Sequence, residues 1–349
     1  MNMYKPPSWI VPLLFVPGVI WETLLRARNY LYESGALTVR SLPRPVISIG
    51  NITLGGSGKT PLAIHVARLL AQSAATPVLL SRGYGRRARR RCDIVRPDSP
   101  VVLPGYDLGD EPALVRRSVP EAWLGVSADR FEAGVQIAAK VANSVFILDD
   151  GFQHRKLRRD LDLLVLDSTQ ALRGNLIFPR GSLREPVEEV RRCHAVLING
   201  TGSGARLLDE AFGSIHPLAR VFHCEQRIET LVPYPEWLAG NPAQGSVTAP
   251  VFLVAAIGNP YRFKRDVTAL GLQICGSRFY RDHFAPGTAE WRTCWEKARS
   301  SGARCLLTTE KDAVKIRMDP GVPLVVAVQS TRISESDAFR EMILSAATV

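Results

Sequence analysis

A glycine-rich stretch beside a lysine and a threonine is the first feature of this sequence that could do chemistry. Residues 49–61 read IGNITLGGSGKTP and begin within the apolar run PVISIG. Glycines let backbone N–H groups converge on an anion, and a helix that starts at Gly-Lys-Thr adds the positive end of its dipole. The stretch therefore predicts a phosphate-binding loop, in which Lys59 reaches the β- and γ-phosphates and Thr60 places its hydroxyl on Mg²⁺.

The loop departs at one position from the common nucleotide-binding pattern G-x-x-x-x-G-K-[ST]. That pattern has glycine where this chain has Thr53. Gly55, Gly56 and Gly58 still give the backbone its freedom, and the order of strand, loop and helix is kept. A plain glycine-rich turn is the alternative, but the context favours a phosphate site.

A pair of acidic residues ends a second apolar run, SVFILDDG at 144–151. Carboxylates at the carboxyl end of a parallel strand face the ligand crevice, and a phosphate-binding loop needs such an acid to hold Mg²⁺. Asp149 and Asp150 are therefore the candidate magnesium ligands. Capping or turn chemistry is the alternative role, and Asp167, at the end of LDLLVLD, is a weaker candidate.

The elements that must position these groups alternate along the chain. Apolar runs such as PVISIG, TPVLLSRG and AVLING are separated by helix-like stretches, among them TPLAIHVARLLAQ. This predicts an α/β fold: a P-loop NTPase-like parallel sheet domain, covered on both faces, with a second, smaller α/β domain. The predicted organisation is an N-terminal segment at 1–28, a P-loop core at 29–223, a linker at 224–250 and a C-terminal α/β domain at 251–349.

Composition bounds the class of protein without choosing a function. The 349 residues are 46% hydrophobic and 22% charged, which suits one large or two ordinary domains. The net charge is +11, with 36 arginines against 8 lysines, so nucleic acid, anionic lipid and phosphorylated small molecules all stay open as partners, beside a merely solvated basic surface. The six cysteines form no C-x-x-C pair, which is typical of reduced thiols.

The N-terminal stretch PPSWIVPLLFVPGVIWETLLRAR carries no charge from Pro6 to Trp21. This run is shorter than the roughly 20 residues that span a bilayer, and its prolines disfavour a straight helix. Two interpretations stay open. One is an interfacial segment with tryptophans at the level of the headgroups and Arg26 and Arg28 beyond them, and the other is a buried core helix.

Eight motifs together resemble one family, the tetraacyldisaccharide 4'-kinases of lipid A synthesis in Gram-negative bacteria. In chain order they are GNITLGGSGKTP, SRGYGR, GDEP, LDDGFQH, GSLREP, GNPYRF, DHF and TTEKDAVK. The glycine loop is common to many NTPases, whereas LDDGFQH together with GDEP and TTEKDAVK is specific. Thr53 is the family's own form of the loop, which removes the objection that it raised.

The resemblance implies a lipid kinase that uses ATP and Mg²⁺ to phosphorylate the 4'-hydroxyl of an acylated glucosamine disaccharide 1-phosphate. It implies a peripheral enzyme at the cytoplasmic face of the bacterial inner membrane, in contact with an anionic membrane surface. It also implies that the smaller C-terminal domain closes over the nucleotide bound to the P-loop core.

The family's functional residues carry over one by one. The catalytic carboxylate is the aspartate of GDEP, here Asp110, partnered by the histidine of the DH motif, here His283, with Lys59 as the third catalytic residue. The resemblance places ATP on Thr53, Leu54, Gly55, Gly56, Ser57, Gly58, Lys59 and Thr60. It places Mg²⁺ on Thr60, Asp149, Asp150 and, less strongly, Glu185 of LREP. Arg82 and Arg184 are expected to have a role at the site, toward the substrate, while the arginines that bind its 1-phosphate stay open.

Two other classes of function stand beside the kinase. A P-loop NTPase that switches or powers a protein partner would hydrolyse nucleotide without added lipid, and the GDEP and DH motifs argue against it. A nucleic-acid-binding protein would need groove-reading motifs or basic strands interleaved with aromatics, which the sequence lacks. We therefore expect no nucleic acid and no obligate protein partner. The remaining arginines of SRGYGRRARRRC are expected to add only general attraction to anionic lipid.

Overall fold

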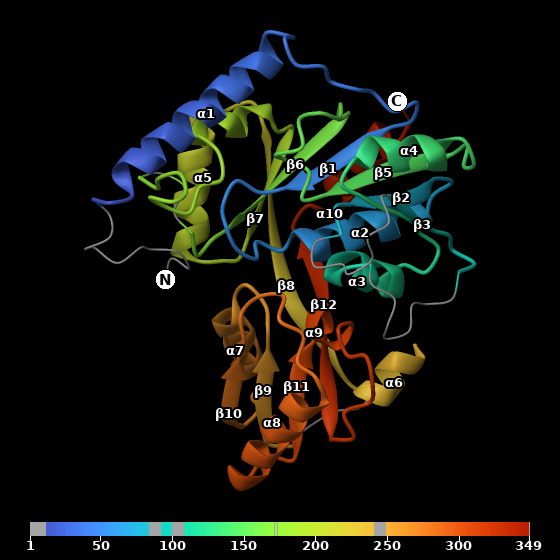
Figure 1. Cartoon of the computed structure of the whole chain (residues 1–349), viewed down its shortest axis with the longest axis vertical. Helices are drawn as coiled ribbons and strands as arrows, with labels where there is room; N and C mark the ends of the chain where they lie inside the picture. Colours follow the sequence, from blue (N-terminus) through green and yellow to red (C-terminus); the bar gives the residue numbers. More distant parts are fainter. Residues whose placement is uncertain are drawn as a thin grey trace.

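The computed structural model describes residues 12–83, 92–99, 108–170, 172, 174–240 and 249–348. Strands from this part of the chain form one continuous sheet of twelve, in the order β10-β9-β11-β12-β8-β7-β6-β1-β5-β2-β4-β3 (Figure 1). Their bounds are β1 Val46–Gly50, β2 Thr76–Ser81, β3 Cys92–Val95, β4 Trp123–Ser127, β5 Ser144–Asp149, β6 Leu161–Asp167, β7 Ala195–Asn199, β8 Arg220–Pro233, β9 Val251–Ala255, β10 Ile274–Phe279, β11 Cys305–Thr309 and β12 Leu324–Ile333.

Two parallel blocks make up the sheet. In the first, β8, β7, β6, β1, β5, β2 and β4 run parallel, and β3 pairs antiparallel with β4 at the edge. In the second, β10, β9, β11 and β12 run parallel. The blocks meet where β12 pairs antiparallel with the long strand β8. We call residues 12–219 together with the C-terminal helix α10 the first lobe, and residues 234–323 the second lobe.

Helices cover both faces of the sheet, as the alternation of elements predicts (Figure 1). Strands of such a sheet are continuous apolar runs because neither face meets water, and β5 is buried at every position. The helices are α1 Phe15–Glu33, α2 Lys59–Ala71, α3 Asp110–Ser118, α4 Arg130–Ala138, the 3₁₀ helix η1 Val187–Arg192, α5 Ser203–Ile215, α6 Tyr234–Ala239, α7 Pro260–Ala269, α8 Thr288–Ser300, α9 Glu310–Ala313 and α10 Ser336–Ala346. The predicted α/β class is confirmed.

The chain passes between the lobes twice, which the predicted domain organisation does not include. Residues 224–233 were assigned to a linker but form most of β8, and α6 follows directly. The Gly/Pro-rich composition that suggested a connector belongs to the following residues, of which 241–248 lie outside the described part. After the second lobe, β12 returns and α10 packs into the core of the first lobe through Phe339. The other boundaries stay a prediction.

Helix α1 lies on the first lobe with its charged face inward. Glu22 pairs with Arg180, and Arg28 pairs with Glu185, both at 2.5 Å. Leu25 is buried, but the other large apolar side chains of the helix are exposed, namely Phe15, Val16, Val19, Ile20, Trp21, Leu24 and Leu31. The core-helix interpretation is therefore wrong. Across the described residues, no helix has both the length and the apolar character that spanning a membrane requires.

Candidate active site

Strand β1 leads into the glycine loop, and α2 begins at Lys59, as the motif predicts. Gly58 is the N-cap of α2, and its φ of 95° is a left-handed conformation that favours glycine. Space imposes the same choice, because a Cβ atom at position 58 would lie 2.0 Å from Nε2 of Gln226 and 2.5 Å from Nδ2 of Asn199. The backbone of the loop is thus packed directly against two amide side chains.

These two amides hold the loop in its shape. Asn199, the last residue of β7, donates from Nδ2 to the carbonyl oxygen of Ser57 at 2.8 Å, and Gln226 of β8 donates to the carbonyl oxygen of Gly58 at 3.2 Å. The C=O and N–H of one planar peptide point in opposite directions. Fixing the carbonyl groups on the strand side therefore turns the following N–H groups the other way, as anion binding requires. The sequence analysis missed both residues.

Asp149 and Asp150 follow the course of β5, which pairs with β1 so that Asp149 lies opposite Ile49. Asp150 has a left-handed φ of 51°, and its carboxylate faces two cations, Lys59 Nζ at 3.4 Å and Arg184 Nη1 at 2.9 Å. Burial acts to raise the pKa of Asp150, but Lys59 and Arg184 outweigh it and hold that pKa well below its usual range. Asp150 is therefore an ionised carboxylate.

Asp149 is in the opposite electrostatic situation. Its side chain is buried, and its Oδ1 atom has no hydrogen-bond partner among the described residues. Burial, followed by the charges of Glu111 and Asp150, raises the pKa of Asp149 to about 7. The two adjacent carboxyl groups thus lose their protons in different pH ranges, and Asp149 is partly protonated near neutral pH.

Asp149 should make the stability of the ligand-free protein depend on pH near neutrality. Because its folded-state pKa of about 7 exceeds the ordinary value of 3.8, its stabilising contribution is complete at low pH and is lost as pH rises through about 7. From about pH 6 to about pH 8 we expect a loss on the order of 1 kcal/mol, or about 2 °C in Tm for this length. Scanning calorimetry of wild type and Asp149→Asn checks this, and an equal slope in both would contradict it.

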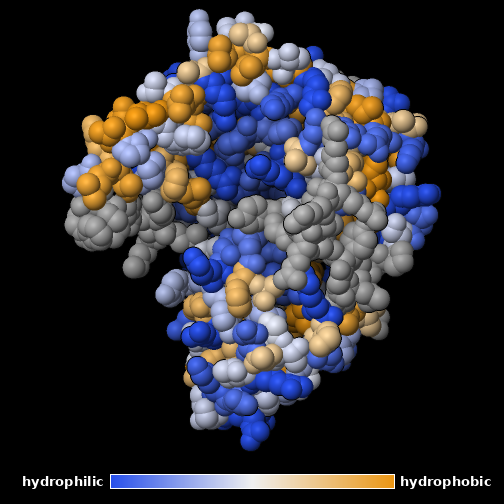
Figure 2. Space-filling model, viewed as in Figure 1, coloured by the Kyte–Doolittle hydropathy of each residue, from blue (hydrophilic) through white to orange (hydrophobic). Residues whose placement is uncertain are grey.

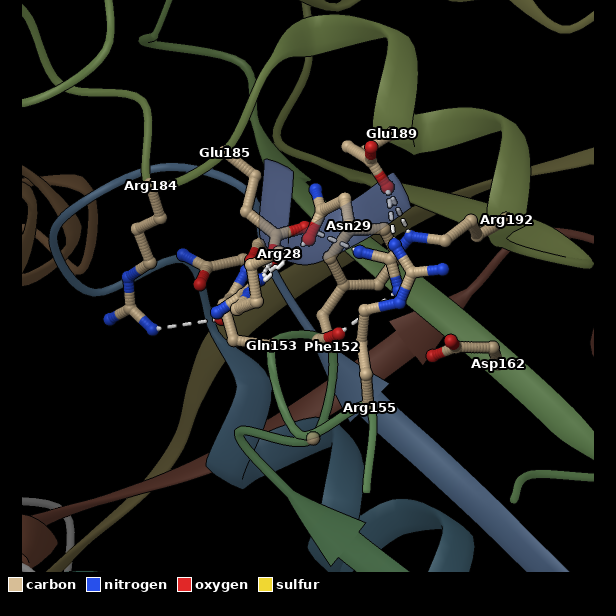
Figure 3. A network of polar contacts seen from close by, with 12 residues as sticks. Arg28, Asn29, Phe152, Gln153, Arg155, Asp162, Arg184, Glu185, Glu189 and Arg192 are labelled. Carbon is tan, nitrogen blue, oxygen red and sulfur yellow. Dashed lines mark hydrogen bonds and ion pairs between the residues drawn. The ribbon is translucent and has the colours of Figure 1, made fainter. Parts of the chain in front are cut away.

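Glu185, predicted as a weaker magnesium ligand, does not join the two aspartates. It is fully buried, and its two oxygens bind Arg28 of α1 at 2.5 Å and Arg192 of η1 (Figure 3). In the same view Arg184 extends to the other side, toward Gln153. Arg184 thus faces Asp150, whereas the next side chain, Glu185, is fully engaged by two arginines away from the aspartates. The prediction for Glu185 is wrong for that reason.

Within the described residues, no group of three His, Cys, Asp or Glu side chains is arranged to hold a metal ion. Mg²⁺ sites in phosphoryl-transfer proteins commonly use one or two carboxylates, with water and substrate phosphates as the remaining ligands. The buried, unpartnered Oδ1 of Asp149 and the position of Thr60 on the first turn of α2 fit such a site.

Asp110 and His283 meet across the two lobes. Asp110 is the first residue of α3 in the first lobe, and His283 lies in the loop after β10 in the second. Nδ1 of His283 is 3.0 Å from Oδ2 of Asp110, and because a carboxylate only accepts, Nδ1 carries the proton. His283 has a left-handed φ of 64°. Such backbone strain in a non-glycine residue is concentrated at functional sites.

Two lysines of the motif TTEKDAVK surround this pair. Lys315 Nζ lies 4.0 Å from Oδ2 of Asp110 and 2.6 Å from Asp312. Lys311 pairs with Asp282 at 3.2 Å. Burial acts to lower the pKa of Lys311, but the neighbouring carboxylates outweigh it and raise that pKa. The second lobe therefore brings positive charge to the Asp110 side of the cleft.

A cavity of about 720 Å³ opens between the lobes and joins these groups. Gly258 of the second lobe contacts the loop, since a Cβ there would lie 2.9 Å from the Gly56 nitrogen. Asp110 itself is not among the lining residues, although its neighbour Glu111 and its partner His283 are. The predicted site residues that line the cavity are Gly55, Gly56, Ser57, Gly58, Lys59, Thr60, Arg82, Asp149, Asp150, Arg184 and His283.

Two predicted nucleotide-binding residues are engaged elsewhere. Thr53 forms a β-bridge with Leu183, and the backbone N–H of Leu54 donates to the Ser182 carbonyl oxygen at 2.7 Å. They brace the loop instead of lining the cavity.

The remaining arginines of the SRGYGRRARRRC stretch, for which general attraction to anionic lipid was predicted, lie outside the described residues. They are Arg86, Arg87, Arg89, Arg90 and Arg91.

The basic side chains at the cavity that were not predicted from the sequence include Arg130, His154 and Arg262. Arg262 of α7 donates to Oδ1 of Asn199 at 3.0 Å and so links the second lobe to the residue that holds the loop. Burial lowers the pKa of Arg130, and burial together with nearby cations lowers the pKa of His154 to about 4. His154 and Arg262 belong to the motifs LDDGFQH and GNPYRF, whereas Arg130 has no such signal.

A loop shaped for phosphate, facing a carboxylate and an imidazole in a cleft, suits the transfer of a phosphoryl group to a hydroxyl. With this loop placed between β1 and α2 of a parallel sheet, the chain is a phosphotransferase of the P-loop class. The profile of the tetraacyldisaccharide-1-P 4'-kinase family matches residues 10–348, and the chain belongs to that family.

Named relatives agree with this assignment. The chain is 34% identical over 308 residues to the tetraacyldisaccharide 4'-kinase of Geobacter metallireducens, covering 88% of this chain and 89% of that protein. It is 30% identical over 363 residues to the enzyme of Syntrophus aciditrophicus, covering 97% and 94%. A crystal structure of LpxK from Aquifex aeolicus in complex with ATP superposes with a TM-score of 0.72 at 27% identity, over 97% of this chain and 99% of that one. The resemblance seen in the sequence is confirmed.

Proposed function

We propose that the protein transfers the γ-phosphate of ATP to the 4'-hydroxyl of tetraacyldisaccharide 1-phosphate in lipid A synthesis. The observation that carries the proposal is the 3.0 Å contact between Asp110 and His283 beside the cavity of the phosphate loop. The names of the relatives support the acceptor, and the ATP complex of the structural neighbour supports the nucleotide.

The phosphates of ATP lie on residues 55–60 in this proposal. Backbone N–H groups of the loop and the N-terminus of α2 receive the anion, and Lys59 neutralises the charge that builds as the phosphoryl group leaves. Lys59 is prepared for this role because Asp150 holds its ammonium group at 3.4 Å, within the lining of the cavity.

Mg²⁺ is the cofactor that the site would hold through Thr60 and Asp149, with Asp150 close by. The unpartnered Oδ1 of Asp149 supports this placement. When bound, the ion neutralises phosphate charge. Asp149 would have to lose its proton to hold the ion, so magnesium affinity should rise with pH near 7.

Asp110 acts on the acceptor in this proposal. A sugar hydroxyl is a poor nucleophile, and a carboxylate within hydrogen-bond reach accepts its proton as the new P–O bond forms. His283 holds that carboxylate by donating from Nδ1. Lys315, 4.0 Å from the same oxygen, stabilises its negative charge. Arg82 and Arg184, which both line the cavity, are proposed to attract the phosphate of the lipid.

Helix α1 is proposed to rest on the anionic cytoplasmic face of the bacterial inner membrane. Figure 2 shows apolar residues gathered over α1, beside the hydrophilic middle of the same face of the molecule. Ion pairs at 2.5 Å hold the charged face of α1 on the protein, so the apolar face is turned outward. An acceptor with four acyl chains stays in its membrane, and an enzyme lying on that membrane gains access to it.

We expect the triple variant Leu13→Ser, Phe15→Ser, Ile20→Ser to lose most of its binding to vesicles that contain anionic lipid, while its Tm and ATP binding stay as in wild type. These side chains are 70%, 59% and 56% exposed, so their loss removes membrane contact and little packing. Sedimentation with vesicles measures the effect.

The matched control is Leu218→Ser, Leu270→Ser, Met318→Ser, at three exposed apolar residues away from α1. It should bind vesicles as wild type does. If the α1 triple variant sedimented as fully as this control, α1 would not be the membrane contact.

The proposal as a whole is tested by incubating the purified protein with γ-labelled ATP and the purified lipid disaccharide. Label should appear on the lipid. A P-loop NTPase that switches or powers a protein partner would instead release labelled inorganic phosphate at the same rate with or without lipid. That result would contradict the kinase proposal and support an NTPase that acts on a protein partner.

A further inference from the structure

Helix α3 carries Asp110 at its start and is attached to both lobes. On one side, Arg116 is buried and donates to the carbonyl oxygen of Pro97 at 2.8 Å, and also to those of Ser99 and Pro120, all in the first lobe. Arg117, the next residue, turns to the second lobe. Its guanidinium carbon lies 3.9 Å from the centroid of the Trp237 ring, and Nη1 donates to the Leu238 carbonyl oxygen at 3.2 Å.

Trp237 is a rigid support for this contact. It is 5% exposed, lies in the hydrophobic core of the second lobe and stacks on Tyr234 with ring centroids 6.1 Å apart. Its indole Nε1 donates to Glu310 Oε1 at 3.5 Å, and Glu310 is the first residue of α9. We call Arg117, Trp237 and Glu310 the α3 clamp.

The clamp and the Asp110–His283 contact lie at opposite ends of one short helix. Asp110 and Arg117 are seven residues apart, or about 10 Å along the axis. Without the clamp, α3 would still be held to the first lobe through Arg116 and could tilt about that anchor, and a tilt of roughly 10° displaces the start of the helix by about 2 Å. That displacement would break the 3.0 Å contact of Asp110 with His283.

We propose that Arg117 and Trp237 are positioning residues for phosphoryl transfer, because their stack fixes the tilt of α3 on the second lobe and so keeps Asp110 against His283. The inference rests on the proposed function, in which Asp110 accepts the proton of the acceptor hydroxyl. Neither residue lines the cavity. Their effect reaches the reaction through α3, since a misplacement of about 1 Å at a reacting group can cost up to about a hundredfold in rate, and a smaller average displacement costs less.

The first experiment measures kcat, KM for ATP and Tm for Arg117→Gln and Arg117→Lys. Arg117 is only half-buried on the helix surface, so both variants should fold. We expect Arg117→Gln to lower kcat about tenfold with KM for ATP within about twofold of wild type, because the phosphate loop is untouched. Arg117→Lys keeps a cation over the ring and should recover most of the rate.

The matched control is Arg96→Ala, which removes the stack of a guanidinium over Trp123, 5.7 Å from its centroid, and leaves the backbone carbonyl groups of Pro97 and Ser99 that hold Arg116 in place. It should leave kcat unchanged. A folded Arg117→Gln variant with the kcat of the control would overturn the proposal. Trp237→Phe and Trp237→Leu form the second pair, with the smaller loss expected for phenylalanine.

A double-mutant cycle separates positioning from a general loss of packing. In an Asp110→Asn background, Arg117→Gln should reduce the residual kcat by less than about twofold, because the group that it positions is already gone. A full tenfold loss in both backgrounds would overturn the proposal. If the wild-type protein releases labelled phosphate but labels no lipid, the proposed kinase function is wrong. That outcome differs from both results of the double-mutant cycle, which compare lipid labelling among variants.

A readout without activity completes the test. The imidazole nitrogen chemical shifts of His283, assigned with His283→Gln, report its hydrogen bond to Asp110 directly. Arg117→Gln should move them in the same direction as Asp110→Asn does. Shifts identical to those of wild type would show that α3 keeps its place without the clamp.

Discussion

We expect Lys59→Ala to lower kcat by at least about a thousandfold while the protein stays folded. Lys59 opens α2 at the cavity, and its ammonium group lies 3.4 Å from Asp150. In the transition state, charge spreads over the oxygens of the transferred phosphoryl group, and this cation is the loop side chain that meets it. Folding should survive because Asp150 keeps its ion pair with Arg184 at 2.9 Å.

The measurement compares kcat from labelled ATP and Tm for wild type, Lys59→Ala and the control Lys140→Ala, at an exposed residue just after α4. The control should keep wild-type kcat. If Lys59→Ala retained more than about a tenth of wild-type kcat, the loss would be under about 1.4 kcal/mol, and the loop would not be the catalytic phosphate site.

The phosphate-binding part of the site, which consists of the glycine loop and the start of α2, could be predicted because its residues are neighbours in the sequence. The loop and the start of α2 are contiguous in sequence, so glycine content and the helix signal are enough to define them. The position of Asp149 near the loop could be predicted from sheet topology, because the carboxyl ends of neighbouring parallel strands lie side by side. Asn199, which ends β7, satisfies the same rule. Asn199 was missed because the sequence analysis looked for charged and metal-binding side chains, and Asn199 instead donates to the backbone carbonyl oxygen of Ser57.

Side-chain direction explains the errors. Arg184 and Glu185 are neighbours in one motif, and the resemblance placed both near the site, but only Arg184 lines the cavity. Glu185 turns to Arg28 and Arg192. Thr53 and Leu54 likewise belong to the loop in sequence and brace it from outside. A motif fixes which residues are near one another and leaves open which way each side chain points.

Contacts between the lobes were the least accessible to prediction. No local pattern relates Asp110 to His283, and the pairing came from the family resemblance alone. Arg117 and Trp237 belong to none of the motifs, and the stack between them depends on how β8 carries the chain into the second lobe. Residues 224–233 were assigned to a linker, whereas they form most of β8, in which buried positions are interrupted by exposed and half-buried ones.

Asp110→Ala is expected to lower kcat by about a hundred- to ten-thousandfold and to change KM for ATP little. The carboxylate accepts a proton only as the new bond forms, so its loss is felt mainly in the transition state. Asp110 contacts His283 at 3.0 Å, and Asp110 itself is not among the residues that line the cavity of the phosphate loop. A large rise in KM for ATP with kcat unchanged would assign Asp110 to nucleotide binding instead.

His283→Ala tests whether the two groups act as one unit. Alone it should cost less than Asp110→Ala, because the carboxylate remains and Lys315 still lies 4.0 Å from its oxygen. The double variant should then be nearly as active as Asp110→Ala, since His283 has no carboxylate left to orient. His223→Ala, whose ring pairs with Asp209 at 3.2 Å away from the cavity, is the matched control for loss of a histidine–aspartate contact. Losses that multiply in full would mean that Asp110 and His283 contribute separately, and His283 would then have to act on the phosphates or the acceptor in its own right.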